Sequence, residues 1–154
     1  MHCCAHNPTG IDPTQEQWRE IAQVIKEKQL FPFFDGAYLG FATGDLELDT
    51  FSIRLFVEEG IEFFLAQSYA KNFGLYGERI GTLSVHTNNP STITPLKSQI
   101  SRTVRTMYSN PPTYGARVVA TVLGDEELHQ EWLESLKYVG NNMESVINFP
   151  SPDI

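Results

Sequence analysis

Residues 68–79 read Ser68-Tyr69-Ala70-Lys71-Asn72-Phe73-Gly74-Leu75-Tyr76-Gly77-Glu78-Arg79. This segment places one lysine, Lys71, three residues after a serine and eight residues before an arginine. A lysine amine that reacts with a carbonyl must be held still and partly desolvated, because only the neutral amine attacks. A serine hydroxyl and an arginine fork are suitable donors to a phosphate group. The segment therefore predicts a carbonyl-reactive lysine beside a phosphate that Ser68 and Arg79 hold.

Pyridoxal phosphate is the phosphate-bearing aldehyde that such a site would bind as a cofactor. Two other interpretations of the segment are open at this point. The Ser-x-x-Lys pattern also occurs in serine acyltransferases of the β-lactamase kind, but their Ser-Asp-Asn and Lys-Thr-Gly tripeptides are absent from this sequence. A lysine in a glycine-rich turn is also commonly an ordinary surface residue. The rest of the chain has to decide between these interpretations.

The composition argues against several classes of function. The chain has 154 residues, which is enough for one domain with a sizeable core. Its net charge of −8, without a compensating basic run, argues against a nucleic-acid partner. No apolar run approaches the length of a membrane helix. The adjacent Cys3 and Cys4 show no metal-ligand or disulfide spacing, so we predict no metal site. Free thiols fit a reducing compartment, and we expect a cytoplasmic location, with a mitochondrial one left open.

Hydrophobic patterning and breaker residues predict alternating helices and strands. Asp12 is expected to cap the first helix, with Pro13 at its first position and Gln15 closing a capping box. Gly60 is expected to end the second helix at the C′ position, and Thr94 to cap the third helix. The expected helices cover residues 13–28, 46–59, 95 up to the break at 110–112, 114–123 and 125 onward, and the expected strands cover residues 30–34, 62–66 and 80–85.

This alternation indicates α/β architecture with a largely parallel sheet and flanking helices. Residues 30–34 form a continuous apolar run, which is typical of a strand buried on both faces. In parallel sheets, ligands bind beyond the carboxyl ends of the strands. Asp35 and Ser68 each follow such an end in different units, so we expect them to share one crevice.

Asp35, Tyr38 and Asn7 complete the predicted site. A carboxylate at the end of an apolar strand is costly unless it has a partner, and a protonated pyridine nitrogen would be such a partner. Asp35 would thereby keep the cofactor ring positively charged, which makes the ring an electron sink. Tyr38 and Asn7 could each donate a hydrogen bond to the ring's phenolate oxygen. Simpler roles are also open: Asp35 as a loop cap, Asn7 in an Asx-turn and Tyr38 as an interface aromatic.

Several segments of the chain resemble those of the fold-type I pyridoxal-phosphate enzymes, and among them the aspartate aminotransferases. The resemblance extends over about residues 2–140. The run at residues 68–76 is specific to this subfamily, whereas Asn-Pro-Thr-Gly at residues 7–10 marks only the wider class. The matching segments are His6-Asn7-Pro8-Thr9-Gly10, Phe33-Phe34-Asp35-Gly36-Ala37-Tyr38, Ser68-Tyr69-Ala70-Lys71-Asn72-Phe73-Gly74-Leu75-Tyr76, Glu78-Arg79 and Ser109-Asn110-Pro111-Pro112.

The resemblance implies a role for each of these residues. Lys71 would bond covalently to the cofactor and then carry the proton between the reacting carbons, with Asp35 and Tyr38 completing the catalytic group. Asn7 would contact the substrate as well as the cofactor, and His2 would support Asp35 from behind. The residues implied to contact pyridoxal phosphate are Asn7, Asp35, Tyr38, Ser68, Lys71, Arg79, Ser109 and Asn110.

The resemblance also implies a homodimer with shared active sites. Arg105 would reach into the neighbouring subunit's site and bind the side-chain carboxylate of the substrate, because a planar guanidinium fork matches a carboxylate. Ser109 and Asn110 would lie near the partner's phosphate site. The simpler interpretation of Arg105 is a solvated helix position, with Arg102 one turn away on the same face.

The implied reaction is the transfer of an amino group between L-aspartate and 2-oxoglutarate, giving oxaloacetate and L-glutamate. Subunits of the family are more than twice as long, so we expect a central fragment without the N-terminal Gly-Thr phosphate loop and the C-terminal small domain. Residues 1–140 would form part of the large domain, and residues 141–154 an unstructured, divergent tail. Two alternatives are a truncated chain without activity and an aminotransferase of the same fold that acts on aromatic substrates.

Overall fold

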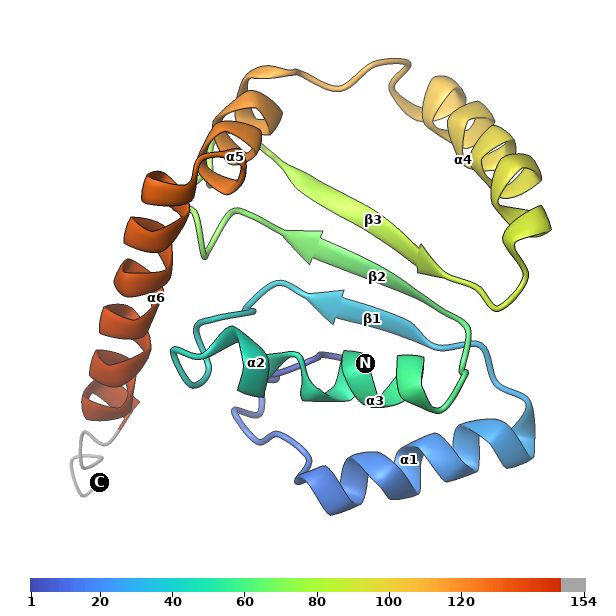
Figure 1. The fold of residues 1–154 in the computed structure, drawn as a ribbon, viewed down its shortest axis with the longest axis horizontal. Coiled ribbons are helices and arrows are strands. Elements are labelled where there is room, and N and C mark those ends of the chain that lie inside the picture. The colour runs from blue at the N-terminus through green and yellow to red at the C-terminus, as the bar shows by residue number, and fades with distance from the viewer. Residues whose placement is uncertain (148–154) are drawn as a thin grey trace.

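The computed structural model describes residues 1–147, which form three strands flanked by helices (Figure 1). The strands are β1 (Phe33–Gly36), β2 (Phe63–Ser68) and β3 (Gly81–His86). The helices are α1 (Gln15–Lys28), α2 (Leu46–Asp49), α3 (Phe51–Glu58), α4 (Ile93–Met107), α5 (Tyr114–Gly124) and α6 (Glu126–Ile147), with a short 3-10 turn at Pro90–Thr92. Among the described residues, no helix is both long and apolar enough to cross a membrane.

The sheet has the order β1-β2-β3 and is mixed. β1 and β2 run parallel, with Asp35 opposite Ala66, whereas β3 runs antiparallel to β2, with Gly81 opposite Ser68. A parallel neighbour requires a long crossover, usually a helix, but residues 69–80 form turns, so the chain reverses direction. The predicted α/β architecture is confirmed. Parallel pairing is limited, among the described residues, to β1 with β2 and a bridge between His2 and Asp35.

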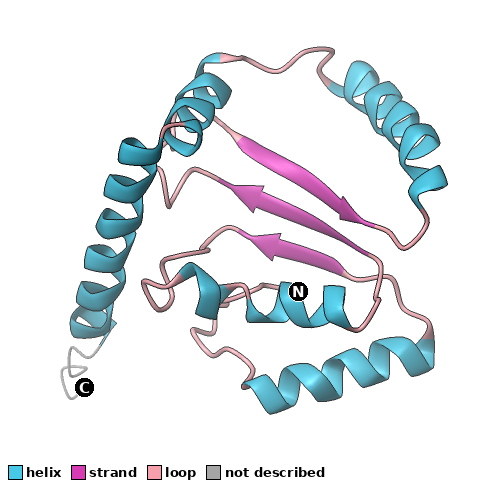
Figure 2. Ribbon diagram, viewed as in Figure 1, coloured by secondary structure: helices cyan, strands magenta, loops and turns pink. Residues whose placement is uncertain are grey.

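A core of aromatic and aliphatic side chains fixes the position of β1. Helices α1, α2 and α3 lie on one side of the sheet (Figures 1 and 2). Phe34 of β1 and Phe56 of α3 are fully buried with their ring centroids 4.9 Å apart, and Trp18 of α1 packs edge-on against Phe56. Burial of each such ring stabilises the fold by about 1.5–3 kcal/mol. Asp35, the neighbour of Phe34, is held in place by the same packing.

The start of α1 differs from the prediction. Thr14 is its N-cap, and the Thr14 hydroxyl and Gln17 side chain each accept the other residue's backbone N–H in a capping box. The Asp12 carboxylate instead accepts hydrogen bonds from the backbone N–H groups of residues 5 and 6, at 2.5 and 2.8 Å. The predicted cap by Asp12 and Gln15 was therefore wrong, because the neighbouring turn presents unpaired donors that bind Asp12.

Two further helix boundaries differ. The helix expected over residues 46–59 is interrupted at Thr50 and forms α2 and α3. Gly60 follows α3 with φ +65°, which confirms its predicted position after the helix end. The next helix begins after Thr92 rather than Thr94, because the Asn89 side chain accepts a backbone hydrogen bond and starts a 3-10 turn just upstream.

Helices α5 and α6 begin close to the predicted positions. α6 continues to Ile147, so residues 141–147 are helical where an unstructured tail was expected, and residues 148–154 lie outside the described residues. In Figure 1, α6 runs along the edge of the molecule toward which β1 and β2 point. Its Gly140 lies so close to Gly44 that a Cβ atom there would come within 2.3 Å of the Gly44 Cα. The backbone of α6 is therefore packed directly on the turn that follows β1.

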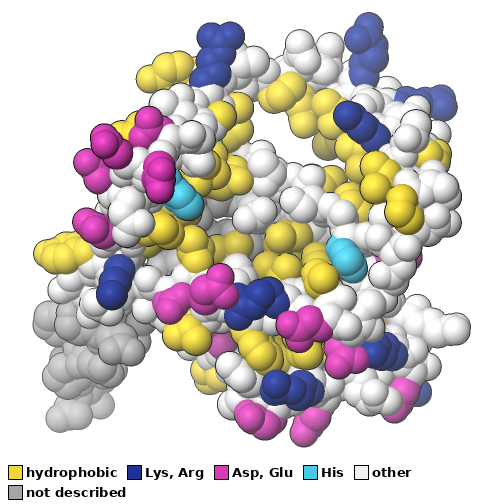
Figure 3. Space-filling model, viewed as in Figure 1, with side chains coloured by type: hydrophobic (Ala, Val, Ile, Leu, Met, Phe, Trp, Pro, Cys, Tyr) yellow, Lys and Arg dark blue, Asp and Glu magenta, His cyan; other side chains and the backbone are white. Residues whose placement is uncertain are grey.

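Part of the apolar surface is not covered by the described residues. The run at residues 30–34 was expected to be a strand buried on both faces, but β1 starts at Phe33, whose side chain is 50% exposed. That expectation was wrong because α1, α2 and α3 cover only one face. Leu30 and Phe33 line a groove of about 900 Å³ beside α1. α4 buries none of its residues, and Figure 3 shows hydrophobic side chains around a hollow between α4, α5 and the sheet.

Candidate active site

The carboxyl ends of β1 and β2 form one polar edge of the sheet. Asp35 is the third residue of β1 and Ser68 is the last residue of β2, and the two strands are hydrogen-bonded parallel neighbours. Their carboxyl ends therefore meet at the same edge, as predicted. In Figure 1 this edge faces α6. The segment that follows β2 carries Lys71, and the segment that follows β1 carries Tyr38.

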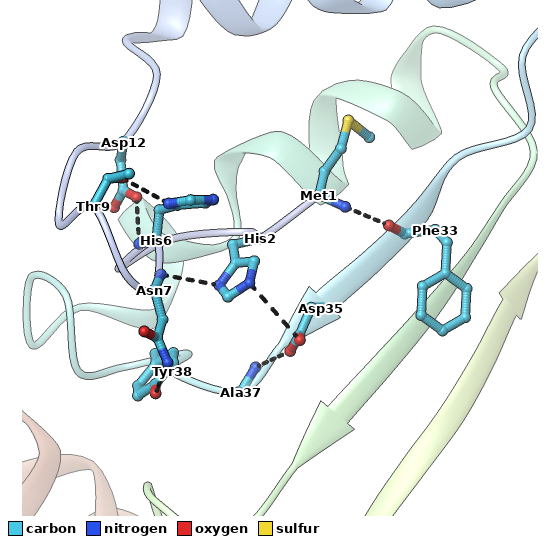
Figure 4. A network of polar contacts seen from close by, with 10 residues as sticks. All are labelled: Met1, His2, His6, Asn7, Thr9, Asp12, Phe33, Asp35, Ala37 and Tyr38. Atoms are coloured by element: carbon cyan, nitrogen blue, oxygen red, sulfur yellow. Dashed lines mark hydrogen bonds and ion pairs between the residues drawn. The ribbon is translucent and has the colours of Figure 1, made fainter.

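Asp35 is linked to the N-terminal segment through His2. One Asp35 oxygen, Oδ1, accepts a hydrogen bond from Ala37 N at 3.1 Å, and Oδ2 lies 4.0 Å from His2 Nε2. The His2 ring lies between Asp35 and Asn7, whose backbone N donates to His2 Nδ1 at 3.4 Å (Figure 4). Since Nδ1 accepts, the neutral ring carries its proton on Nε2 and presents it to Asp35. Asp35 thus caps a loop with Oδ1, while its side chain as a whole stays 48% exposed.

Asn7 and Tyr38 approach each other from two segments far apart in the sequence. The Asn7 side-chain amide donates to the Tyr38 hydroxyl oxygen at 3.4 Å. Asp12 holds the turn that precedes Asn7, and the Cys4 thiol donates to the Tyr38 carbonyl at 3.6 Å. Because its oxygen accepts from Asn7, the Tyr38 hydroxyl keeps its own proton available for another acceptor.

Lys71 is half-buried, and its amine lies over two aromatic rings. Lys71 Nζ is 5.6 Å from the centroid of the Tyr38 ring and 5.5 Å from that of Tyr76. A cation at this distance from a ring face is attracted by the ring's quadrupole. The structure therefore places the amine beside Tyr38, whose segment leaves the end of β1, although the two residues are 33 positions apart in the sequence.

Ser68 and Arg79 flank the Lys71 segment at its two ends. The Ser68 hydroxyl oxygen accepts from Ala70 N at 3.2 Å and keeps its proton free to donate. Arg79 donates one N–H to the Tyr76 carbonyl at 3.2 Å, which leaves most of its five donors for another acceptor. Its backbone has φ +50°, a left-handed conformation that costs energy in a residue other than glycine and is common at functional sites.

Arg105, Ser109 and Asn110 lie apart from this edge. Arg105 is in the last turn of α4, and α4 lies on the opposite side of the molecule from α6 in Figure 1. All three side chains are exposed, and none forms a hydrogen bond or ion pair with another predicted site residue in the described part of the chain. Ser109 also has a left-handed backbone, with φ +66°. A single copy of the chain thus does not bring these residues to Lys71.

Sequence reasoning missed Asp49, which organises the segment after Tyr38. Asp49 is only 3% exposed, and its carboxylate accepts from Gly40 N at 2.8 Å, Ala42 N at 3.1 Å and Thr43 Oγ1 at 2.9 Å. Burial raises the pKa of this carboxyl above its ordinary value, although these hydrogen bonds oppose the change. No sequence signal identifies Asp49, because its partners are two backbone N–H groups and one hydroxyl of a loop.

Two other groups have no place in the site. Burial raises the pKa of the Cys3 thiol to about 12, and that of Cys4 is also raised, so neither is a ready nucleophile. The described residues hold no group of three or more His, Cys, Asp and Glu side chains that could bind a metal ion. A cleft of about 520 Å³ lies between Lys71 and helices α5 and α6, but Asp35 and Tyr38 do not line it.

Sequence comparison relates the chain to known proteins. It matches the family model described as Aminotransferase class I and II over residues 1–143. It is 54% identical over 146 residues to a chloroplastic aspartate aminotransferase from Arabidopsis thaliana and 52% identical over 146 residues to a cytoplasmic one from Dictyostelium discoideum. These matches cover 95% of this chain but 32% and 33% of the relatives. The chain thus spans about a third of their length.

Solved structures share the fold. An aromatic-amino-acid aminotransferase from Burkholderia pseudomallei, covalently bound to pyridoxal phosphate, matches with a TM-score of 0.92 and 40% identity over 96% of this chain and 37% of that one. An aspartate aminotransferase from Trypanosoma cruzi matches with a TM-score of 0.86 and 53% identity over 90% of this chain and 35% of that one. The arrangement of strands and helices is therefore that of a segment of these larger proteins.

Proposed function

Because the chain belongs to the aminotransferase class I and II family, we propose that its polar edge binds pyridoxal phosphate for transfer of an amino group between L-aspartate and 2-oxoglutarate. The products are oxaloacetate and L-glutamate. The observation that carries this proposal is the placement of the Lys71 amine 5.6 Å from the Tyr38 ring, whose segment leaves β1 just after Asp35. An amine, a carboxylate and a phenol are thereby grouped at one strand edge.

The side chains at this edge fit the cofactor chemically. The Asp35 carboxylate is 48% exposed and can pair with a protonated ring nitrogen, and the Tyr38 hydroxyl keeps a proton for the ring oxygen. Ser68 and Arg79 supply a hydroxyl and a guanidinium for the phosphate. When bound, pyridoxal phosphate supplies an electron sink for the substrate's reacting carbon.

In this proposal the chain's own residues position and move protons. Lys71 Nζ would provide the amine that holds the cofactor and, once neutral, would take the proton from the substrate's Cα and pass it to the cofactor carbon to which the amino nitrogen is joined. The negative charge on Asp35 would keep the ring nitrogen protonated, and His2 Nε2 lies 4.0 Å from Asp35 Oδ2. Asn7 orients the Tyr38 hydroxyl through the 3.4 Å hydrogen bond.

The substrate's second carboxylate is assigned to Arg105 of a neighbouring copy. The Arg105 side chain is exposed, and its guanidinium forms no hydrogen bond or ion pair with another described residue, so the fork is available to another chain. Ser109 and Asn110, also exposed, would approach the neighbour's phosphate. This arrangement requires a homodimer in which each active site is shared.

Two other functions are kept as candidates. The 40% identity to the Burkholderia pseudomallei aromatic-amino-acid aminotransferase supports an aromatic substrate as the second candidate. A chain that holds the cofactor without turnover is the third, because this chain spans about a third of its relatives' length. The free thiols and the cytoplasmic Dictyostelium relative support a cytoplasmic location, although other relatives are named mitochondrial and chloroplastic.

The test of activity uses the chain itself and a chimera in which residues 1–143 replace the matching segment of the Arabidopsis chloroplastic relative. Each protein is given pyridoxal phosphate, 2-oxoglutarate and either L-aspartate or L-phenylalanine, and the oxo acid formed is measured. We expect oxaloacetate from the chimera and almost none from its Lys71→Ala variant. Full activity in the Lys71→Ala chimera would refute the proposed site, and a preference for phenylalanine would support the aromatic candidate. If the chimera is active and the 154-residue chain is not, the result would favour the third candidate, in which this chain holds the cofactor without turnover.

Arg105 gives the sharpest test of the substrate class. In the chimera, Arg105→Ala should weaken transition-state binding of aspartate by roughly 2–5 kcal/mol, the usual cost of removing one member of a buried charge pair. The transition state for L-alanine, which has no second carboxylate, should be affected little. Arg102→Ala, one turn away on the same helix, is the matched control and should leave both substrates unchanged. An equal loss for aspartate and alanine would make Arg105 a structural helix residue instead.

A further inference from the structure

Asn72, the residue after Lys71, joins three parts of the molecule. Its side-chain amide donates to the carbonyl oxygen of Leu39 at 3.2 Å, and Leu39 directly follows Tyr38. Its own carbonyl oxygen accepts from the indole N–H of Trp132, in α6, at 2.8 Å. One residue therefore connects the segment that carries Lys71 with the segment that carries Tyr38 and with helix α6.

Each attachment point is itself held rigidly. Leu39 is 2% exposed, and the next residue, Gly40, donates its N–H to the buried Asp49 carboxylate at 2.8 Å. On the other side, the Trp132 ring stacks on Phe73 with centroids 4.7 Å apart and an interplanar angle of 25°. Asn72 thus ties the Lys71 segment to a buried residue of the turn after β1 and to a stacked ring of α6.

The chemistry of Asn72 also indicates a role beyond packing. Its side-chain oxygen, Oδ1, is buried and has no hydrogen-bond partner in the described part of the chain. A flipped amide would place two acceptor oxygens, those of Asn72 and Leu39, against each other, so the present orientation is the favourable one. An unpaired buried polar atom costs about 1–3 kcal/mol, a cost that an apolar side chain of similar size would avoid.

We propose that Asn72 is a positioning residue that fixes the Tyr38 hydroxyl relative to the Lys71 amine, and that it does so through the Leu39 carbonyl and Trp132. This inference rests on the proposed function. In that proposal the Tyr38 hydroxyl donates a hydrogen bond to the cofactor's ring oxygen. Such a bond stabilises the deprotonated, charged form of this oxygen, so the bound cofactor titrates at lower pH. A looser Tyr38 would donate less well, so the titration would move to higher pH.

The test measures the visible absorption band of pyridoxal phosphate bound to the 154-residue chain as a function of pH, together with the cofactor's apparent Kd. Asn72→Leu removes the donor at similar volume and should raise the pH midpoint on the order of 0.5 unit and the Kd roughly threefold to tenfold. The shift should have the same sign as that of Tyr38→Phe. In a Tyr38→Phe background, Asn72→Leu should add no further shift, because the two residues act through one hydroxyl.

A matched control separates positioning from stability. The Asn88 amide makes the same kind of bond, donating to the Gly60 carbonyl at 2.6 Å, away from the polar edge. Asn88→Leu should lower the thermal midpoint of unfolding but leave the pH midpoint of the band unchanged. The nearby titratable side chains Asp35, His2, Tyr76, Glu131 and His129 are retained in every variant, so no difference between variants comes from the loss of one of them.

The Trp132→Phe variant keeps the test usable even if the Asn72→Leu protein does not fold. It keeps a ring to stack on Phe73 and removes the N–H that binds the Asn72 carbonyl, together with part of the ring's volume, and it should shift the pH midpoint in the same direction. An unchanged midpoint in both Asn72→Leu and Trp132→Phe would overturn the inference and leave the proposed function standing. If the unmodified chain forms no band through Lys71, the proposed function fails, and the inference with it.

Discussion

Asp35 is the residue on which the proposed cofactor chemistry depends after Lys71. Asp35→Asn keeps the shape of the side chain and the bond to Ala37 N but removes the charge that would hold a ring nitrogen protonated. In the chimera we expect the amino-transfer rate to fall on the order of 10³-fold or more, which corresponds to several kcal/mol of transition-state stabilisation. Steady-state kinetics with aspartate measure this loss.

Asp45→Asn is the control for that substitution. Asp45 is the N-cap of α2 and accepts from Glu47 N at 2.7 Å, and asparagine caps helices as well as aspartate does. The amino-transfer rate of the Asp45→Asn chimera should equal that of the unmodified chimera. A loss of less than about tenfold in Asp35→Asn would mean that Asp35 acts only as the loop cap seen at its Oδ1 atom.

Asp49 predicts a pH dependence of stability. Burial raises the pKa of its carboxyl above the ordinary value of 3.8, so the folded chain binds this proton more tightly than the unfolded chain. The resulting stability is fully present below 3.8 and is lost as the pH rises through the raised pKa. The free energy of unfolding of the wild type relative to Asp49→Asn should therefore fall with rising pH in that window and then level off.

Urea unfolding between about pH 3 and pH 7 measures this difference. An increase of the difference with pH would show that the bonds from Gly40, Ala42 and Thr43 favour the charged carboxylate more than burial disfavours it. Asp49→Ala tests the bonds themselves. It leaves the N–H groups of Gly40 and Ala42 without their acceptor, which should cost about 1–3 kcal/mol for each group that stays buried.

Single residues differed in how far the sequence could predict them. The location of Asp35 and Ser68 was predictable because each polar residue comes shortly after an apolar run that indicates a strand. The partners of Asp12, Asp49 and Asn72 were not, because these side chains bind backbone groups of loops. The residue types at those loop positions do not indicate such a bond. The sequence around Asp12 therefore matched a helix-cap pattern, although its carboxylate binds the backbone N–H groups of residues 5 and 6.

At the scale of elements, the contact between α6 and the turn after β1 depends on two glycines. A Cβ atom on Gly140 would lie 2.3 Å from the backbone N and Cα of Gly44, so Gly140→Ala must push the helix away. We expect a loss of about 1–3 kcal/mol in the free energy of unfolding, the usual cost of overpacking. Gly124→Ala, where nothing lies within 4 Å, should leave stability unchanged or raise it slightly. Equal stabilities for the two variants would show that α6 is not packed tightly on the turn.

The elements themselves followed from the sequence, but their directions did not. Apolar runs and breakers located β1, β2 and β3 to within a few residues. The antiparallel direction of β3 depends on residues 69–80 forming turns instead of a crossover helix, and the glycine-rich turn noted around Lys71 was not used to infer a reversal of the chain. The division between α2 and α3 at Thr50 has no breaker residue to signal it.

At the scale of the whole molecule, the chain itself positions the side chains of the polar edge, but it leaves apolar surfaces exposed. Phe33 and Leu30 are 50% and 55% exposed, and α4 buries no residue. The sequence favoured burial of these groups, because hydrophobic runs indicate burial without indicating which segment covers them. The relatives are about three times as long, so a longer protein has further segments available to cover them.

The assignment of Lys71 is tested most directly by trapping. The 154-residue chain is mixed with pyridoxal phosphate, reduced with borohydride and digested, and the modified peptide is identified by mass spectrometry. We predict one dominant modification, on Lys71, that is absent from Lys71→Ala and retained in Lys97→Ala, whose lysine is exposed on α4. Equal trapping by Lys71→Ala and the unmodified chain, or label spread over the surface lysines, would contradict the proposed cofactor site.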